Sequence, residues 1–201
     1  MDITGRKLFV KAMMEEGVDT IFGYPGGMVT DLFDELYKQD DIHLVLPRHE
    51  QGLIHEAEGY ARATGKPGVC LVTSGPGATN IITGLADAHF DSIPLVCVTG
   101  QVPLPLIGND AFQEVDIVGM TRSITKYGVT VRDRKDLACN HESAHSLDNR
   151  MVHSLTGYPL GYPQEPVPVF RWLQCEMPCV LFFPNLFCPE RAGFLSLRPW
   201  D

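Results

Sequence analysis

The sequence predicts an α/β fold in which helices flank a parallel β-sheet. Short apolar runs alternate with segments of helical periodicity over about the first 137 residues, which is typical of repeated strand–helix units. Residues 69–72 and 95–98 are apolar at successive positions, as expected of strands that are buried on both faces. The 201 residues, 44% hydrophobic and 20% charged, suffice for one ordinary domain with its own core.

The elements follow one another in a regular order. Thr4 is placed to cap a first helix with apolar residues at helical spacing, and Gly17 is placed to end it. We expect strands at residues 20–22, 42–46, 69–72, 94–99 and 127–131. We expect further helices at residues 29–37, 50–64 and 81–90 and from residue 137 onwards, with a loop-rich stretch over residues 100–119.

Composition changes near residue 138. Four of the six cysteines, eight of the fifteen prolines and both tryptophans follow Ala138, and the last 64 residues hold no lysine. No regular period continues there. We therefore divide the chain into a domain at residues 1–137, incomplete at its C-terminal end, and an atypical Pro/Cys-rich tail at residues 138–201 that we expect to be poorly ordered.

Charge and hydropathy exclude several classes of partner. Sixteen Lys and Arg against 25 Asp and Glu give a net charge of −9, which argues against a nucleic-acid or anionic-membrane surface. No apolar run reaches the roughly 18 residues of a membrane span, and the first residues do not resemble a targeting leader. The cysteines form no C-x-x-C pair, so we expect reduced thiols, a cytoplasmic location and small-molecule or protein partners.

Glu50 is the first candidate for chemistry. It follows the strand at residues 42–46 and begins a helix, at the carboxyl edge of the sheet where ligands of α/β proteins bind. On spacing alone, an acid that the helix dipole favours is the simpler interpretation. Gln101 ends a later strand at the same edge.

Two glycine turns could serve a ligand or only the fold. Residues 74–77 lie between a buried strand and a helix, where backbone N–H groups can hold an anion or form a plain tight turn. Pro25, Gly26 and Gly27 would let a flat ligand approach the backbone, or allow a sharp corner.

Other polar residues have simple surface interpretations. We read His49 as a polar edge residue and expect His55 and Glu58 to face solvent. Arg122 and Lys126 are four residues apart, so on a helix they would share one face, basic or merely solvated.

Seven runs, taken in order, resemble the amino-terminal domain of acetolactate synthase catalytic subunits, which are thiamine diphosphate enzymes. They are FGYPGG at 22–27, RHEQG at 48–52, AEGYAR at 57–62, TSGPGATN at 73–80, TGQVP at 99–103, DAFQE at 110–114 and SITK at 123–126. The resemblance covers about residues 1–137. Related thiamine diphosphate enzymes share a glutamate at Glu50, so the sharper markers are residues 100–103, 111–114 and 124–126.

The resemblance implies a role for each matching residue. Glu50 would be catalytic, hydrogen-bonding the aminopyrimidine ring of thiamine diphosphate and moving a proton there. The residues implied in other contacts are Gln101, Pro25, Gly26 and Gly27 for thiamine diphosphate, Ser92 and Arg122 for FAD, and Gln113 and Lys126 for the substrate channel. The turn at residues 74–77 becomes a packing turn, and no residue is assigned to a metal.

The family reaction decarboxylates pyruvate and joins the product to a second 2-oxo acid in branched-chain amino acid biosynthesis. In the family, the diphosphate and Mg²⁺ are held by the carboxy-terminal domain of the partner subunit. The resemblance thus implies a homo-oligomer, dimer or tetramer, with a regulatory small subunit as a further partner.

The tail departs from the family. The expected G-R-P-G-P and D-I-P-K patterns do not appear, and Gly-Tyr-Pro-Gln at 161–164 is what D-I-P-K codons can give when read out of frame. We hypothesise a frameshift near residue 138 and expect this chain to be inactive alone. A non-catalytic chain that associates with related subunits, and another thiamine diphosphate lyase or oxidase, remain as alternatives.

Overall fold

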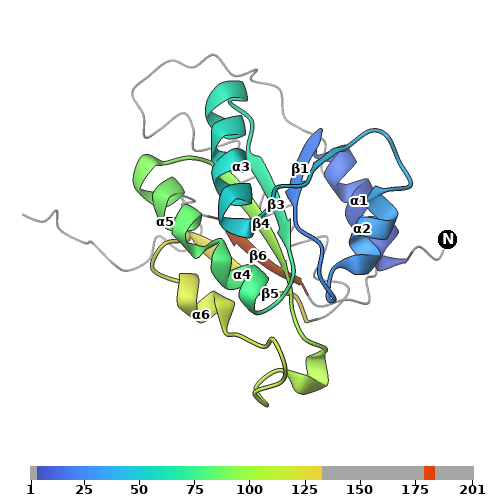
Figure 1. The fold of residues 1–201 in the computed structure, drawn as a ribbon, viewed down its shortest axis with the longest axis vertical. Helices are drawn as coiled ribbons and strands as arrows, with labels where there is room; N and C mark the ends of the chain where they lie inside the picture. The colour runs from blue at the N-terminus through green and yellow to red at the C-terminus, as the bar shows by residue number, and fades with distance from the viewer. Residues whose placement is uncertain (1–3, 133–178, 184–201) are drawn as a thin grey trace, which may run out of the picture.

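A six-stranded sheet lies between two layers of helices in the computed structural model, which describes residues 4–132 and 179–183 (Figure 1). The strands are β1 (Thr20–Gly23), β2 (His43–Val45), β3 (Gly68–Val72), β4 (Leu95–Gly100), β5 (Tyr127–Thr130) and β6 (Cys179–Phe183). Their order across the sheet is β2-β1-β3-β4-β6-β5. The four strands from β2 to β4 are parallel, which confirms the predicted fold class.

Helices cover both faces of the sheet. They are α1 (Gly5–Glu15), α2 (Thr30–Leu36), α3 (Glu50–Thr64), α4 (Pro76–Asn80), α5 (Ile82–Asp91), the 3₁₀ turn η1 (Leu104–Leu106) and α6 (Ile117–Thr121). In Figure 1, α1 and α2 lie on one side of the sheet, and α3, α4 and α5 lie on the other. No helix within the described ranges combines the length and apolar character that a membrane crossing requires.

Strand periodicity divides the core between these layers. Every residue of β3 and β4 is buried. Val69 and Leu71 pack in the cluster that includes apolar residues of α1 and α2, while Cys70 and Val72 pack in the cluster that includes α3 and α5. Successive side chains of a strand point to opposite faces, so the continuous apolar runs fill both cores.

The predicted helices differ from the observed ones at two places. Thr4 is the N-cap residue of α1, but its side chain makes no capping hydrogen bond. The helix predicted at residues 81–90 begins earlier and is interrupted, because Pro76 opens the short helix α4 before α5 starts. Gly17 follows α1 with φ +75°, as its predicted terminating role requires. The helix expected from residue 137 lies outside the described residues.

Strand β6 lies in the segment that we predicted to be an atypical tail without regular structure. Its backbone pairs antiparallel with β4 on one side and with β5 on the other. An apolar run of five residues, CVLFF, between two prolines forms this strand. β6 was not among the predicted strands, and the division of the chain at residues 137/138 stays a prediction.

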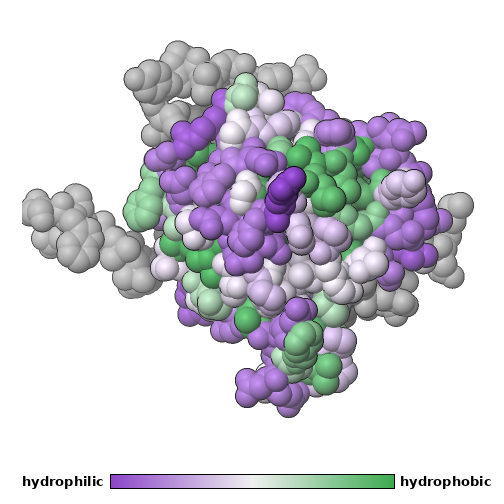
Figure 2. Space-filling view, viewed as in Figure 1, coloured by the Kyte–Doolittle hydropathy of each residue, from purple (hydrophilic) through white to green (hydrophobic). Residues whose placement is uncertain are grey.

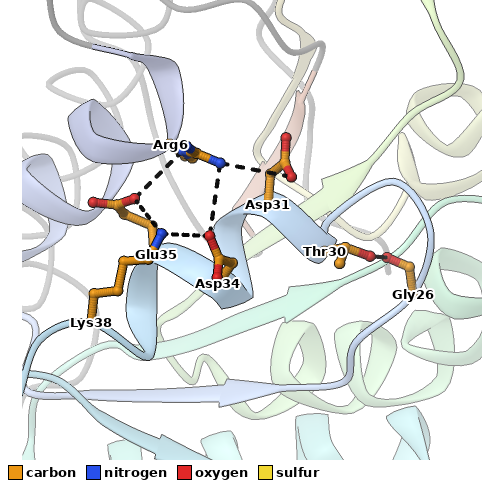
Figure 3. Close-up of polar contacts among 7 residues, drawn as sticks. All are labelled: Arg6, Gly26, Thr30, Asp31, Asp34, Glu35 and Lys38. Carbon is orange, nitrogen blue, oxygen red and sulfur yellow. Dashed lines mark hydrogen bonds and ion pairs between the residues drawn. The ribbon is translucent and has the colours of Figure 1, made fainter.

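Ion pairs join α1 to α2 on the outer surface. Arg6 of α1 lies 3.9 Å from Asp31, 3.8 Å from Asp34 and 3.5 Å from Glu35 on α2 (Figure 3). Lys38 also contacts Asp34, at 2.5 Å. Most of these side chains are well exposed to solvent, so each pair adds little to stability.

A second polar network joins the end of α3 to the start of β1. The Asp19 carboxylate accepts hydrogen bonds from the Tyr60 hydroxyl at 2.6 Å and the Thr20 hydroxyl at 2.9 Å, and pairs with Lys66 at 2.5 Å. These hydrogen bonds lower the pKa of Asp19 to about 2, and the one from Lys66 has the largest effect.

Helices α3 and α5 approach closely at Gly84. A Cβ atom at position 84 would lie 2.1 Å from Cγ2 of Ile54, whereas one at Gly59 would meet nothing within 4 Å. Ile54 is fully buried, so it has little freedom to move away.

Asp19→Asn should lower the free energy of unfolding by about 0.5–1 kcal/mol near neutral pH, because the network is largely at the surface. The folded pKa of about 2 is below the usual value of about 3.9, so the contribution is complete above about pH 4 and is lost as pH falls through about 2. Denaturant unfolding of both proteins at several pH values measures the difference. Asp40→Asn, at an exposed aspartate, is the control, and a difference that did not shrink on acidification would contradict the assignment.

Gly84→Ala should destabilise the fold by about 1–3 kcal/mol, because the added methyl group collides with Ile54 in a packed core. Gly59→Ala, on the open face of α3, should leave stability unchanged or raise it by about 0.5–1 kcal/mol. Thermal unfolding of the two variants measures both effects. Equal stability of the two variants would show that α5 can move away from α3.

Candidate functional site

The carboxyl ends of the parallel strands meet at one edge of the sheet. The turn after β1 begins at Tyr24, the turn after β3 begins at Thr73, and Gln101 follows β4. The Tyr24 amide donates to the carbonyl of Leu71, 2.9 Å away, so the chain after β1 stays beside β3. Glu50 opens α3, directly after the segment that follows β2. This edge therefore gathers most of the residues that the sequence singled out.

Glu50 is half-buried and held by one hydrogen bond. Its Oε2 accepts from Nδ2 of Asn80 at 3.0 Å. A Cβ atom at Gly77 would lie 2.8 Å from Cγ2 of Thr73 and 3.5 Å from Oε1, so the backbone of α4 packs closely against Thr73 and lies beside that oxygen. One carboxylate oxygen is thus anchored, and the other borders the backbone of α4.

His49 caps the start of α3. As the N-cap residue of α3, its Nδ1 accepts from the backbone N–H of Gln51 at 3.1 Å. This confirms the interpretation of His49 as a polar edge residue and fixes the start of α3 next to Glu50.

The turn at residues 74–77 contributes to this site through Asn80. Gly75 has φ +58° and ψ −117°, which a residue with a side chain rarely adopts. The turn leads into α4, whose last residue, Asn80, donates to Glu50. As a packing turn this segment is not expected to contribute to the site, and Asn80 is not among the predicted residues, because its bond to Glu50 joins segments thirty residues apart.

The loop at Pro25, Gly26 and Gly27 is closely packed at one position. A Cβ atom at Gly26 would lie 2.5 Å from Cβ of Thr73, while one at Gly27 would meet nothing within 4 Å. The Gly26 carbonyl accepts from the Thr30 hydroxyl at 3.1 Å (Figure 3). Gly26 therefore fits the loop against the end of β3, and Pro25 and Gly27 are exposed.

Gln101 is buried, and both ends of its amide are bonded. Oε1 accepts from the backbone N–H of Val102 at 2.8 Å, and Nε2 donates to the carbonyl of Val115 at 3.1 Å. The side chain ties the end of β4 to the segment before α6. One N–H of the amide is left for a further partner.

The segment at residues 103–116, which we call the arm, returns to the 74–77 turn. Gln113 has φ +61°, and a Cβ atom at Gly75 would lie 2.7 Å from its carbonyl oxygen. Backbone N–H groups of Gly108 and Ala111 donate to the Glu114 carboxylate, and these bonds lower the pKa of Glu114. Gln113 therefore lies beside the 74–77 turn, which leads into the helix that ends at Asn80.

The arm also exposes apolar side chains. It projects at the bottom of Figure 1, and Figure 2 shows hydrophobic surface on that projection. Phe112 is 89% exposed, and Leu104 and Leu106 are also exposed.

Ser92, Arg122 and Lys126 lie on other segments. Ser92 ends α5 with φ +57° and is exposed, and Arg122 is the exposed C-cap residue of α6. Because α6 ends at Thr121 and Lys126 precedes β5, Arg122 and Lys126 do not share a helical face.

Glu58 is buried, contrary to the expectation that it faces solvent. Only 4% of the residue is exposed, its Oε2 lies 2.7 Å from Nδ1 of His55, and burial raises its pKa. Helical spacing from Leu53, Ile54 and Ala57 places residue 58 on the buried face of α3. The expectation of solvent exposure rested on the charge of Glu58 instead. Cys70 and Cys97 are buried free thiols, as expected.

Comparison with known proteins agrees with this arrangement. The family model for the N-terminal TPP binding domain of thiamine pyrophosphate enzymes matches residues 3–120. The acetolactate synthase catalytic subunit of Saccharomyces cerevisiae is 56% identical over 145 residues, which are 72% of this chain and 21% of that protein. Acetolactate synthase 3 of Brassica napus is 55% identical over 196 residues, 97% of this chain and 28% of that protein.

The chain thus spans between about a fifth and a third of the length of these relatives. The family match covers more than half of the chain and includes Glu50, the 74–80 segment and Gln101. The chain therefore belongs to the thiamine pyrophosphate enzymes and carries their N-terminal TPP binding domain.

Proposed function

We propose that residues 4–132 form the half of an acetolactate synthase site that binds the aminopyrimidine ring of thiamine diphosphate. In this proposal Glu50 exchanges a proton with the ring. The observation that carries it is the position of Glu50 at the carboxyl edge, with Oε2 held by Asn80 and Oε1 beside the bare backbone of Gly77.

The residues at this edge suit a flat, nitrogen-containing ring. A general acid–base carboxylate must lie about 2.6–3.2 Å from the atom that it protonates, which requires a fixed orientation and free space. Asn80 holds Oε2 in a fixed orientation, and Oε1, beside the backbone of Gly77, is the oxygen that we assign to the ring. When bound, thiamine diphosphate supplies the carbanion chemistry that decarboxylates a 2-oxo acid. The chain's part is to position and protonate the ring.

The other expected contacts form part of the proposal. Gln101 would contact thiamine diphosphate with its remaining N–H, and the loop at Pro25, Gly26 and Gly27 would lie beside the reacting centre. Gln113, held against the 74–77 turn, suits the substrate channel better than Lys126, which lies nearer β5.

FAD and Mg²⁺ are the remaining expected cofactors. We propose that Ser92 and Arg122 contact FAD, and both are exposed at helix ends where a ligand can reach them. We assign Mg²⁺ and the diphosphate to the carboxy-terminal domain of a partner subunit, as the family resemblance implies, and to no residue of this chain.

The names of the relatives support the synthase among the possible reactions. They are acetolactate synthases, so pyruvate and a second 2-oxo acid are the proposed substrates, and a lyase or oxidase of another kind is not favoured. A homo-oligomer and a regulatory small subunit remain proposed partners. Several relatives carry the words mitochondrial or chloroplastic, and a cytoplasmic location of this chain stays a prediction.

Glu50→Gln tests the role of the carboxylate in a chimaera. Residues 4–132 would replace the matching segment of acetolactate synthase 2 of Nicotiana tabacum, which is 56% identical over 196 residues. We expect the chimaera to make acetolactate, and Glu50→Gln to lower kcat by about 10²–10⁴-fold because proton transfer is lost. Glu56→Gln, at an exposed acid on the same helix, should leave kcat unchanged. Equal loss in both variants would contradict the proposal.

An activity assay of the purified chain distinguishes an active synthase from a non-catalytic chain. With thiamine diphosphate, Mg²⁺, FAD and pyruvate, we expect the purified chain to form no acetolactate, because the resemblance places the diphosphate and Mg²⁺ in another domain. Turnover that is abolished by Glu50→Gln would overturn this expectation.

A further inference from the structure

Three side chains with metal-binding atoms lie together between α3 and α5, away from the carboxyl edge. Nδ1 of His55 lies 2.7 Å from Oε2 of Glu58 and 3.8 Å from Oδ2 of Asp87. All three ligand atoms are within 4.8 Å of one another.

Backbone packing produces this cluster. His55 and Glu58 are three residues apart on α3, so their side chains lie on the same face. Gly84 lets α5 approach α3 so closely that a Cβ there would collide with Ile54. Asp87 is the next residue on the same face of α5, and the close approach brings its carboxylate to His55.

Glu58 is the least solvated member. Its side chain is 6% exposed, and the hydrogen bond to His55 satisfies only Oε2. Oε1 is buried and has no hydrogen-bond partner within residues 4–132 and 179–183. An unpaired buried carboxylate oxygen is costly, so a nearly buried carboxylate with one such oxygen beside a histidine and a second acid calls for a further partner.

We propose that His55, Glu58 and Asp87 bind a divalent transition-metal ion of the Zn²⁺ type. One imidazole nitrogen and two carboxylates are a donor set that such ions accept. Chelation by both oxygens of Glu58 would give Oε1 the partner that it lacks. The two carboxylates would also place their negative charge against a cation.

The distances suit a shared ion after small movements. With metal–ligand bonds of about 2.1 Å and tetrahedral angles, two ligand atoms lie about 3.4 Å apart. The observed separations of 2.7 and 3.8 Å fall on either side of that value. The side chains of His55 and Asp87 are 41% and 53% exposed, so they can adjust while Glu58 stays fixed.

A metal here would join α3 to α5. This metal site is distinct from the Mg²⁺ site that the family resemblance assigns to another domain, and Glu50 is not one of its ligands. The proposal therefore does not depend on the proposed function.

Titration of the full chain with Co²⁺ tests the site. The absorption of bound Co²⁺ shows whether cysteine thiolates are among its ligands, because thiolate ligands add strong near-ultraviolet absorption and nitrogen and oxygen ligands do not. We expect one equivalent to bind without that absorption and to raise Tm by about 5 °C. His55→Ala and Asp87→Asn should each weaken this binding at least tenfold and remove the rise in Tm.

His43→Ala is the matched control, because His43 is an exposed histidine on β2, outside the cluster. It should bind Co²⁺ and gain stability as the unsubstituted chain does. Glu58→Gln keeps the side-chain size, and far-ultraviolet circular dichroism checks that it folds; the folded variant should lose the same equivalent. Unchanged binding in His55→Ala, or an equal loss in His43→Ala, would overturn the proposal.

Discussion

Burial of β3 and β4 on both faces is the constraint on which the rest of the structure depends. Every residue of these strands is buried, so helices must cover both sides of the sheet. Parallel pairing of β2, β1, β3 and β4 then brings their carboxyl ends to one edge. Glu50, the 74–80 segment and Gln101 lie together because of that topology, although they are far apart in the sequence.

At that edge, backbone proximity matters as much as side chains. Gly26 fits against Thr73, and Gly75 fits against Gln113, so three loops pack where side chains would collide. Asn80 then reaches Glu50, whose second carboxylate oxygen lies beside the backbone of Gly77. At Gly84, the absence of a side chain likewise lets α5 approach α3 and places Asp87 near His55 and Glu58. Small residues thus determine which polar groups meet.

The parallel sheet, most element boundaries and the location of Glu50 could be predicted from the sequence, because buried strands and βα turns have strong local patterns. Two features could not. The Asn80–Glu50 bond joins segments thirty residues apart, and β6 joins the sheet only through tertiary pairing. Helical spacing places Glu58 on the buried face of α3, although its charge favours the surface. The spacing of Arg122 and Lys126 could not decide whether they share a helical face, because that depends on where α6 ends.

The central claim is that Glu50 faces the aminopyrimidine ring of thiamine diphosphate. A crystal structure of the tobacco chimaera with thiamine diphosphate tests it most directly. The account predicts that Oε1 of Glu50 lies about 3 Å from a nitrogen of that ring while Oε2 still accepts from Asn80. A ring that is bound beyond hydrogen-bond reach of Glu50 would contradict the account.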